Sequence, residues 1–165
     1  MPDEALDPLP LLAALHERGI EHIVIGGFAV NAHGFIRVTK DLDIVPNPAA
    51  ENLGKLAKLL GDLDSSILDT SDFEAAELPA DPTSRAGLEL GGNFCLLTDL
   101  GRLDVMQWIS GVEADDLYAK LNPDAVEGLV EGVPLRVCGL EHLLVMKRAA
   151  GRPRDLEDLE RLGES

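Results

Sequence analysis

A chain of 165 residues that carries 30 Asp and Glu against 14 Lys and Arg is strongly acidic, with a formal net charge of −16 at pH 7. That charge excludes a broad nucleic-acid-binding face, because generic binding to phosphates needs a cationic surface. The hydrophobic content of 45% is typical of folded proteins, and no apolar run approaches the roughly 20 residues of a membrane span. We expect a single cytoplasmic domain over residues 1–165, in which Cys95 and Cys138 are small buried thiols without metal-binding spacing.

The first third of the chain alternates between helical and extended patterns. The N-terminal segment 1–19 contains leucines at helical spacing and ends at a glycine, which is a common helix stop. The predicted elements of this part are a helix over 7–19, a strand over 20–25, a helix over 26–34, a strand over 38–45 and a helix over 48–63.

Residues 64–86 are acidic and proline-containing, and they predict only a short strand around 66–69. Beyond them, glycine turns separate short apolar runs that are typical of hairpins. The predicted elements are strands over 94–98 and 102–109, a helix over 113–120, strands over 125–130 and 133–137, and a C-terminal helical pair over 139–162. The helix–strand alternation is confined to the first third. The pattern therefore indicates an α/β (α+β) fold, a mixed β-sheet with helices packed on it, and excludes a doubly wound fold.

Two carboxylates stand one residue apart in the second predicted strand. Alternate residues of a strand share a face, so Asp41 and Asp43 project together while Leu42 and Ile44 point to the core. Neighbouring carboxylates repel unless a cation lies between them, and a divalent metal is the usual reason for such a pair. The alternative is a solvated strand end with two unrelated acids.

Asp104 lies inside a later apolar strand, where an unpaired charge is costly. With Asp41 and Asp43 it forms a set of three strand carboxylates of the kind that binds Mg²⁺. The alternative is a structural ion pair between Asp104 and Arg102 or Lys40. The double glycine, Gly26 and Gly27, either makes a tight turn or brings backbone N–H groups close to a phosphate.

Basic residues gather at two places in this acidic chain. Arg37 and Lys40 lie just before the carboxylate pair, and four more lie within eight positions near the C-terminus: Lys147, Arg148, Arg152 and Arg154. We expect these cations to surround a small anion bound near the carboxylates. The apolar residues Phe94, Met106 and Trp108 are expected in the core.

Taken together, G-G-x-A at 26–29, R-x-T-x-D-x-D at 37–43 and a third Asp on a later strand resemble the nucleotidyltransferase superfamily of DNA polymerase β. The segment 146–159, with a Lys, then an Arg, then D-x-x-D, is similar to the AbiEii-like branch. That branch contains minimal nucleotidyltransferases and toxins of bacterial toxin–antitoxin systems. The resemblance covers about residues 20–162 and implies a nucleotidyltransferase-like fold.

The resemblance also implies a chemistry, in which a nucleoside monophosphate moves from a nucleoside triphosphate (NTP) to an RNA or protein hydroxyl. Asp41, Asp43 and Asp104 would bind Mg²⁺ or Mn²⁺, and Asp104 would help to deprotonate the acceptor. The expected phosphate contacts are Gly26, Gly27, Arg37, Lys40, Lys147 and Arg152. Asp155 and Asp158 are either site residues or structural partners of basic side chains. The alternative function is a non-catalytic, partner-binding component of a toxin–antitoxin pair that keeps the fold.

Overall fold

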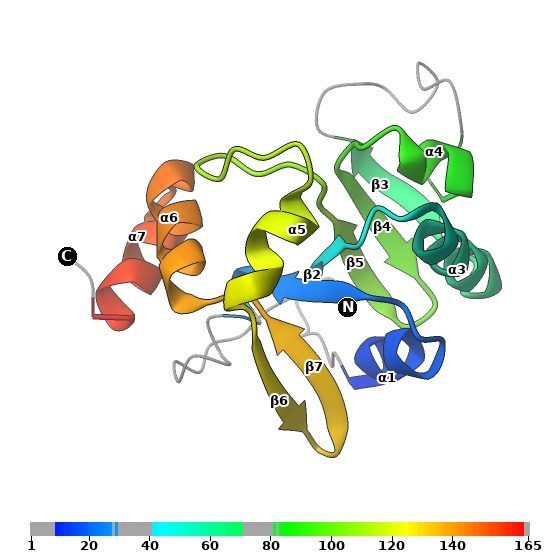
Figure 1. Cartoon of the computed structure of the whole chain (residues 1–165), viewed down its shortest axis with the longest axis horizontal. Coiled ribbons are helices and arrows are strands. Elements are labelled where there is room, and N and C mark those ends of the chain that lie inside the picture. Colours follow the sequence, from blue (N-terminus) through cyan, green and yellow to red (C-terminus); the bar gives the residue numbers. More distant parts are fainter. Residues whose placement is uncertain (1–8, 28, 30–40, 71–80, 82, 164–165) are drawn as a thin grey trace.

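The computed structural model describes residues 9–27, 29, 41–70, 81 and 83–163 (Figure 1). Most of the predicted helix over 26–34 and the first residues of the strand predicted over 38–45 lie outside these ranges. Arg37 and Lys40 lie outside them as well.

Seven strands form one mixed sheet in the order β3-β4-β5-β2-β1-β7-β6. The strands are β1 (His22–Ile25), β2 (Asp41–Pro46), β3 (Ser66–Thr70), β4 (Phe94–Thr98), β5 (Gly101–Val105), β6 (Val126–Val130) and β7 (Val133–Val137). β2 lies between β1 and β5; it is antiparallel to β1 and parallel to β5. β1 is parallel to β7, and both β4–β5 and β6–β7 are antiparallel hairpins. The expected mixed sheet is confirmed.

Helices pack around this sheet, with α3 and α4 side by side at one end and α6 and α7 side by side at the other (Figure 1). They are α1 (Leu9–Glu17), α3 (Ala50–Asp62), α4 (Arg85–Glu89), α5 (Leu117–Leu121), α6 (Leu140–Ala150) and α7 (Pro153–Arg161), with a 3₁₀ turn η2 (Asn122–Asp124). The leucine stripes of α1 and α3 are fully buried, because both helices are amphipathic and face the common core. Among the described residues, no helix is both long and apolar enough to cross a bilayer.

Side-chain alternation in the two central strands separates the core from the polar face. Leu42 and Ile44 of β2, and Leu103 and Val105 of β5, are completely buried. The residues between them therefore project from the opposite face of the sheet, and these include the three aspartates. The predicted arrangement of Asp41 and Asp43 against Leu42 and Ile44 is thus confirmed.

The strand predicted over 102–109 ends early, at Val105. The side chain of Asn93 explains this difference, because its Oδ1 accepts the N–H groups of Gln107 and Trp108 at 2.7 and 3.2 Å. Its Nδ2 also donates to the Trp108 carbonyl at 3.0 Å, which draws the chain away from the sheet ladder. Phe94 is buried as expected, but the prediction for Trp108 was wrong, since its exposed fraction is 44%.

Two helices also differ from the prediction. The helix expected over 113–120 begins only at Leu117, because the Asp116 carboxylate caps it by accepting the Ala119 N–H at 3.0 Å. The short helix α4 was not predicted from the acidic segment; the Ser84 hydroxyl caps it by accepting the Gly87 N–H at 3.1 Å.

Asn52 ties the start of β1 to the loop that follows β2. From inside α3, its Oδ1 accepts the Glu21 N–H at 2.7 Å, and its Nδ2 donates to the carbonyls of Glu21 and Asn47 at 2.9 Å each. The side chain is buried, so these bonds are shielded from water. Asn52 therefore fixes the relative position of the two strands that carry Gly26 and the carboxylate pair.

Replacing Asn52 with Ala leaves three backbone groups without their partners. We expect Asn52→Ala to lower the free energy of unfolding by about 2–3 kcal/mol, measured by urea denaturation. Glu51→Ala, at the neighbouring exposed position of the same helix, is the control and should change stability by less than about 0.5 kcal/mol. Equal effects of the two substitutions would show that Asn52 does not hold the strands together.

Candidate active site

Three aspartates from two adjacent parallel strands meet on the polar face of the sheet. The register of β2 and β5 places Asp43 beside Asp104, and Asp41 beside Arg102. One carboxylate oxygen from each of Asp41, Asp43 and Asp104 lies within 4.8 Å of the others. This spacing is close to the about 4 Å that separates two oxygens on opposite sides of a Mg²⁺ ion.

The electrostatics of this cluster favour an added positive charge. Burial and the nearby Asp104 carboxylate hold the pKa of Asp43 well above its usual value, and the same two causes raise the pKa of Asp41. Oδ1 of Asp43 and Oδ1 of Asp104 are buried and accept no hydrogen bond from any described residue. Hard, unpartnered oxygens at this spacing fit a divalent cation such as Mg²⁺ or Mn²⁺.

Arg102 supplies part of the compensating charge from within the sheet. Its Nε lies 3.3 Å from Oδ1 of Asp41, and its Nη2 donates to the Cys95 sulfur at 3.1 Å. Burial and the neighbouring Asp104 raise the pKa of the Cys95 thiol to about 11, so it stays protonated at neutral pH. The ion pair considered between Arg102 and Asp104 is thus formed with Asp41 instead.

Gly26 is required where β1 ends, for two steric reasons. Its φ of 73° lies in the left-handed region that side chains disfavour. A Cβ atom built on it would lie 2.0 Å from Oδ2 of Asp43, so any side chain would displace the carboxylate. The close approach of backbone and carboxylate explains this glycine by itself, and a phosphate contact at Gly26 and Gly27 remains a prediction.

A cavity of about 400 Å³ opens over the carboxylates. Of the residues expected at the site, those that line it are Gly26, Gly27, Asp41, Asp43, Asp104, Lys147 and Arg152. Arg37 and Lys40 fall outside the described residues. Arg154, one of the cations expected around the anion, also lines the cavity. Sequence reasoning did not assign Arg102 and Met106 to the site, although both alternate with Asp104 along the chain.

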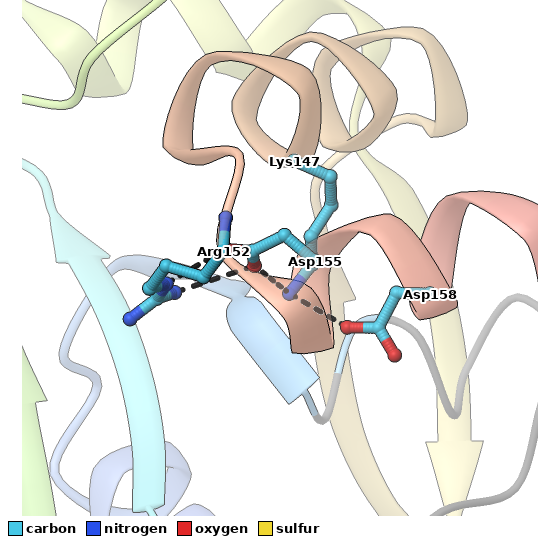
Figure 2. A network of polar contacts seen from close by, with 4 residues as sticks. All are labelled: Lys147, Arg152, Asp155 and Asp158. Carbon is cyan, nitrogen blue, oxygen red and sulfur yellow. Dashed lines mark hydrogen bonds and ion pairs between the residues drawn. The ribbon is translucent and has the colours of Figure 1, made fainter.

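The corner between α6 and α7 contributes a cationic wall to this cavity, made of Lys147, Arg152 and Arg154. Figure 2 shows the ion pairs that Lys147 and Arg152 make there. α6 ends at Gly151 in the left-handed conformation, with φ of 61°, and Pro153 starts α7, so the chain turns sharply. Nζ of the buried Lys147 lies 3.2 Å from Asp155 and 3.0 Å from Asp158. Arg152 reaches the same Asp155 through its Nε at 2.6 Å and its backbone N–H at 3.2 Å.

Asp155 and Asp158 are both buried partners of basic side chains, and Asp155 also lines the carboxylate cavity. Burial alone would raise the pKa of Asp155, but the Arg152 hydrogen bond and the Lys147 charge outweigh it and lower the pKa below its usual value. The two cations and two anions balance, which makes burial of Lys147, Asp155 and Asp158 tolerable, while Arg152 stays exposed. The network holds Lys147 and Arg152 at the edge of the cavity.

A larger cavity of about 700 Å³ lies at the opposite end of β1, around His22 and Tyr118. It contains none of the three aspartates. Cavity size therefore does not identify the site in this protein, and the carboxylate cluster does.

Comparison with solved structures identifies the fold. The lincosamide antibiotic adenylyltransferase LnuA, solved with lincomycin bound, matches with a TM-score of 0.64 at 15% identity, over 97% of this chain and 98% of that chain. A proposed nucleotidyltransferase from Thermotoga maritima matches with a TM-score of 0.59 at 17% identity, over 96% and 95%. The antibiotic-resistance factor ANT(2'')-Ia matches with a TM-score of 0.58 at 21% identity, over 92% and 77%.

No protein-family model matches the sequence, and no curated protein matches it. At these low identities the structural likeness establishes the fold alone. The chain has the nucleotidyltransferase fold expected from G-G-x-A and D-x-D, whereas the AbiEii-like branch remains a prediction.

Removing one charge from the carboxylate cluster should stabilise the metal-free protein. Because the pKa of Asp43 is raised in the folded state, its ionisation destabilises the fold increasingly as pH rises above about 4. We expect Asp43→Asn to raise the free energy of unfolding by about 1–3 kcal/mol at pH 7 without metal, and to give no gain below pH about 4.

The same variant should lose stabilisation by Mg²⁺, which in the native protein reaches about 2.7 kcal/mol at a concentration 100 times the dissociation constant. Thermal unfolding with EDTA or MgCl₂ measures both effects. Asp99→Asn, an exposed position in the turn after β4, is the control and should keep the Mg²⁺ response. A full Mg²⁺ shift in Asp43→Asn would contradict a metal site at this cluster.

Replacing Lys147 should leave two buried carboxylates without their shared cation. We expect Lys147→Met to lower the free energy of unfolding by about 3–5 kcal/mol at pH 7. Since the pKa of Asp155 is lowered in the folded state, its contribution is present above pH about 4 and lost as pH falls through the lowered pKa. The difference between native protein and variant should therefore shrink at acidic pH.

Two further variants sharpen this measurement. Lys58→Met, at an exposed position of α3, should change stability by less than about 0.5 kcal/mol. Adding Asp155→Asn and Asp158→Asn to Lys147→Met should recover part of the loss, because no buried charge is then unpaired. Failure of this recovery would mean that Lys147 stabilises the corner through packing and not through charge.

Proposed function

We propose that the protein is a Mg²⁺-dependent nucleotidyltransferase that moves a nucleoside monophosphate from an NTP to a hydroxyl group. The observation that carries this proposal is the cluster of Asp41, Asp43 and Asp104, which faces a cavity with a cationic wall. The nucleotidyltransferase fold of the chain supports it independently.

In this proposal Asp41, Asp43 and Asp104 hold the divalent cation. When bound, the cation neutralises charge on the phosphates and orients the α-phosphate toward the acceptor. The acceptor oxygen forms a bond to the α-phosphorus, the bond from that phosphorus to the oxygen bridging to the β-phosphate breaks, and pyrophosphate leaves. The carboxylate of Asp104 takes up the proton of the acceptor hydroxyl.

The triphosphate contacts come from both sides of the cavity. Backbone N–H groups at Gly26 and Gly27 approach the phosphates without steric hindrance from a side chain. Lys147 and Arg152 face them from the α6–α7 corner, and Arg37 and Lys40 add further charge. Arg154 lines the same cavity, and its charge partly offsets the rise in the pKa of Asp41, so it is a further phosphate contact.

The acceptor is a hydroxyl group of RNA, of a protein or of a small molecule. Small molecules are among the candidate acceptors because LnuA is a lincosamide antibiotic adenylyltransferase and ANT(2'')-Ia was solved with adenylyl-2''-tobramycin. Repulsion by the net charge of −16 disfavours RNA among the three.

A second candidate function is partner binding without catalysis, as in one component of a toxin–antitoxin pair. The strand β6 favours it, because Val126 and Leu129 on this sheet edge are strongly exposed. Exposed apolar side chains on an unpaired edge are typical of surfaces that add a partner's strand.

Catalysis is tested by incubating the protein with each α-labelled NTP, MgCl₂ and either total RNA, total protein, lincomycin or tobramycin. We expect labelled acceptor and released pyrophosphate with at least one acceptor. Asp43→Asn and Asp104→Asn should each reduce transfer at least about 100-fold, since each removes a proposed ligand of the cation.

Asp99→Asn serves as the matched control and should retain transfer. Binding of Mg–NTP without any transfer or NTP hydrolysis would favour the partner-binding alternative. Absence of any thermal stabilisation by Mg–NTP would exclude an NTP-dependent reaction at this cavity.

A further inference from the structure

The cavity of about 700 Å³ lies where β7 separates from β1, and it shares none of its described lining residues with the carboxylate cavity. Both strands are fully described, and they pair with each other at Val24 and Val137 alone. The residues just before these positions, 20–22 and 134–136, line the cavity from its two sides. Figure 1 shows the β6–β7 hairpin extending past β1 here. The volume lies in the range of small-molecule sites, which is about 300–1,000 Å³.

Two side chains that line this cavity each keep a buried nitrogen without a hydrogen-bond partner among the described residues. His22 donates from Nδ1 to the Ile20 carbonyl at 2.9 Å, so its Nε2 is left as an acceptor. Burial lowers the pKa of His22, which keeps the ring neutral at pH 7. Nε of Arg136 is left as a donor. Buried polar atoms without partners are rare in folded proteins, so a bound molecule that supplies both a donor and an acceptor fits this cavity.

The guanidinium of Arg136 is already ordered by three hydrogen bonds. Its Nη2 donates to the backbone carbonyl and to the side-chain oxygen of Asn122 at 2.9 and 2.8 Å. Its Nη1 donates to Glu127 at 2.5 Å. A ligand oxygen that accepts the remaining Nε–H therefore costs little additional side-chain entropy.

Glu21 supplies a carboxylate that pairs with no cation among the described residues. Its Oε2 accepts the neutral Nδ2 of Asn47 at 2.5 Å. Burial and the Glu21 charge raise the pKa of Tyr118, and the Arg136 charge opposes the rise, so both charges act on the same phenol. Because Arg136 already pairs with Glu127, the lining of the cavity has an excess of negative charge. A ligand with an ammonium group is therefore favoured over an anion.

We propose that this cavity binds the α-ammonium group and the adjacent carbonyl group of an amino acid or of a peptide N-terminus. The ammonium group pairs with Glu21 and donates to Nε2 of His22, and the carbonyl oxygen accepts the Nε–H of Arg136. An apolar side chain on the ligand packs against Leu129, which lines the cavity and is 72% exposed. This site is independent of the proposed function, because it uses none of the residues assigned to nucleotidyl transfer.

The chain has one tyrosine and one tryptophan, which makes a site-specific readout possible. Tyr118 lines this cavity, whereas Trp108 lies in the loop after β5. Protein labelled with 3-fluorotyrosine and 5-fluorotryptophan gives one fluorine NMR resonance for each residue. The Tyr118 resonance reports on the ligand, and the Trp108 resonance is the internal control.

The probes at pH 7 are leucine, leucinamide, leucylglycine, N-acetylleucine and isoamylamine. We expect saturable shifts of the Tyr118 resonance with the first three. Binding should be about tenfold or more weaker with N-acetylleucine, which lacks the ammonium group, and with isoamylamine, which lacks the carbonyl group. Tighter binding of leucine identifies a free amino acid as the ligand, and tighter binding of leucylglycine identifies a peptide N-terminus. Equal affinity for all five compounds, or no shift with any of them, overturns the proposal.

Substitutions test the named contacts. Glu21→Gln and Arg136→Lys should each weaken leucinamide binding about tenfold, while Glu113→Gln, which changes an exposed carboxylate in the loop after β5, should leave it unchanged. Thermal unfolding checks that each variant is folded, and Glu21→Gln decides the test if Arg136→Lys is not. Unchanged affinity in folded Glu21→Gln overturns the proposal. Competition between leucinamide and Mg–ATP would place both ligands in one cavity and overturn it as well.

Discussion

The carboxylates of Asp41, Asp43 and Asp104 repel one another across less than 4.8 Å, at a position where two of their oxygens accept no hydrogen bond from the described residues. Several neighbouring features reduce this repulsion or leave room for the carboxylates. Arg102 pairs with Asp41, and the charge of Lys147 opposes the rise in the pKa of Asp43. The missing side chain at Gly26 leaves the Asp43 carboxylate in place. The sheet thus maintains a destabilising cluster, which is typical of sites whose ligand supplies the missing charge.

The C-terminal helices add cations to this site, and carboxylates of the same helices already balance the charges of these cations. Lys147 is shared by Asp155 and Asp158, and Arg152 is held by Asp155 (Figure 2). Each cation is therefore already held by a carboxylate, so an anion bound there would cost less side-chain entropy than one bound by a mobile surface lysine. The loop after β5 packs on the same helix, since a Cβ on Gly111 would lie 2.7 Å from the Ala149 side chain of α6.

Local patterns in the sequence predicted much of this structure. The alternation Asp-Leu-Asp-Ile placed both carboxylates on one face, and the glycine turns located both hairpins. Two kinds of feature were not predictable in this way. Asn93 ends β5 early through bonds to residues about 15 positions later, and no local signal marks such a contact. The division of Lys147 between Asp155 and Asp158 depends on how two helices pack, so the sequence alone left the roles of both aspartates open.

The parallel pairing of β2 with β5 also has a kinetic consequence. It joins residues about sixty positions apart, so it closes one of the larger loops in the fold and belongs to the slow, non-local steps of folding. Asp43 and Asp104 become neighbours in that same step, so their repulsion opposes the formation of the central sheet as well as the finished state. A divalent cation that bridges them as the strands pair would lower this barrier. The residues that would bind the ion would then also influence how fast the central sheet forms.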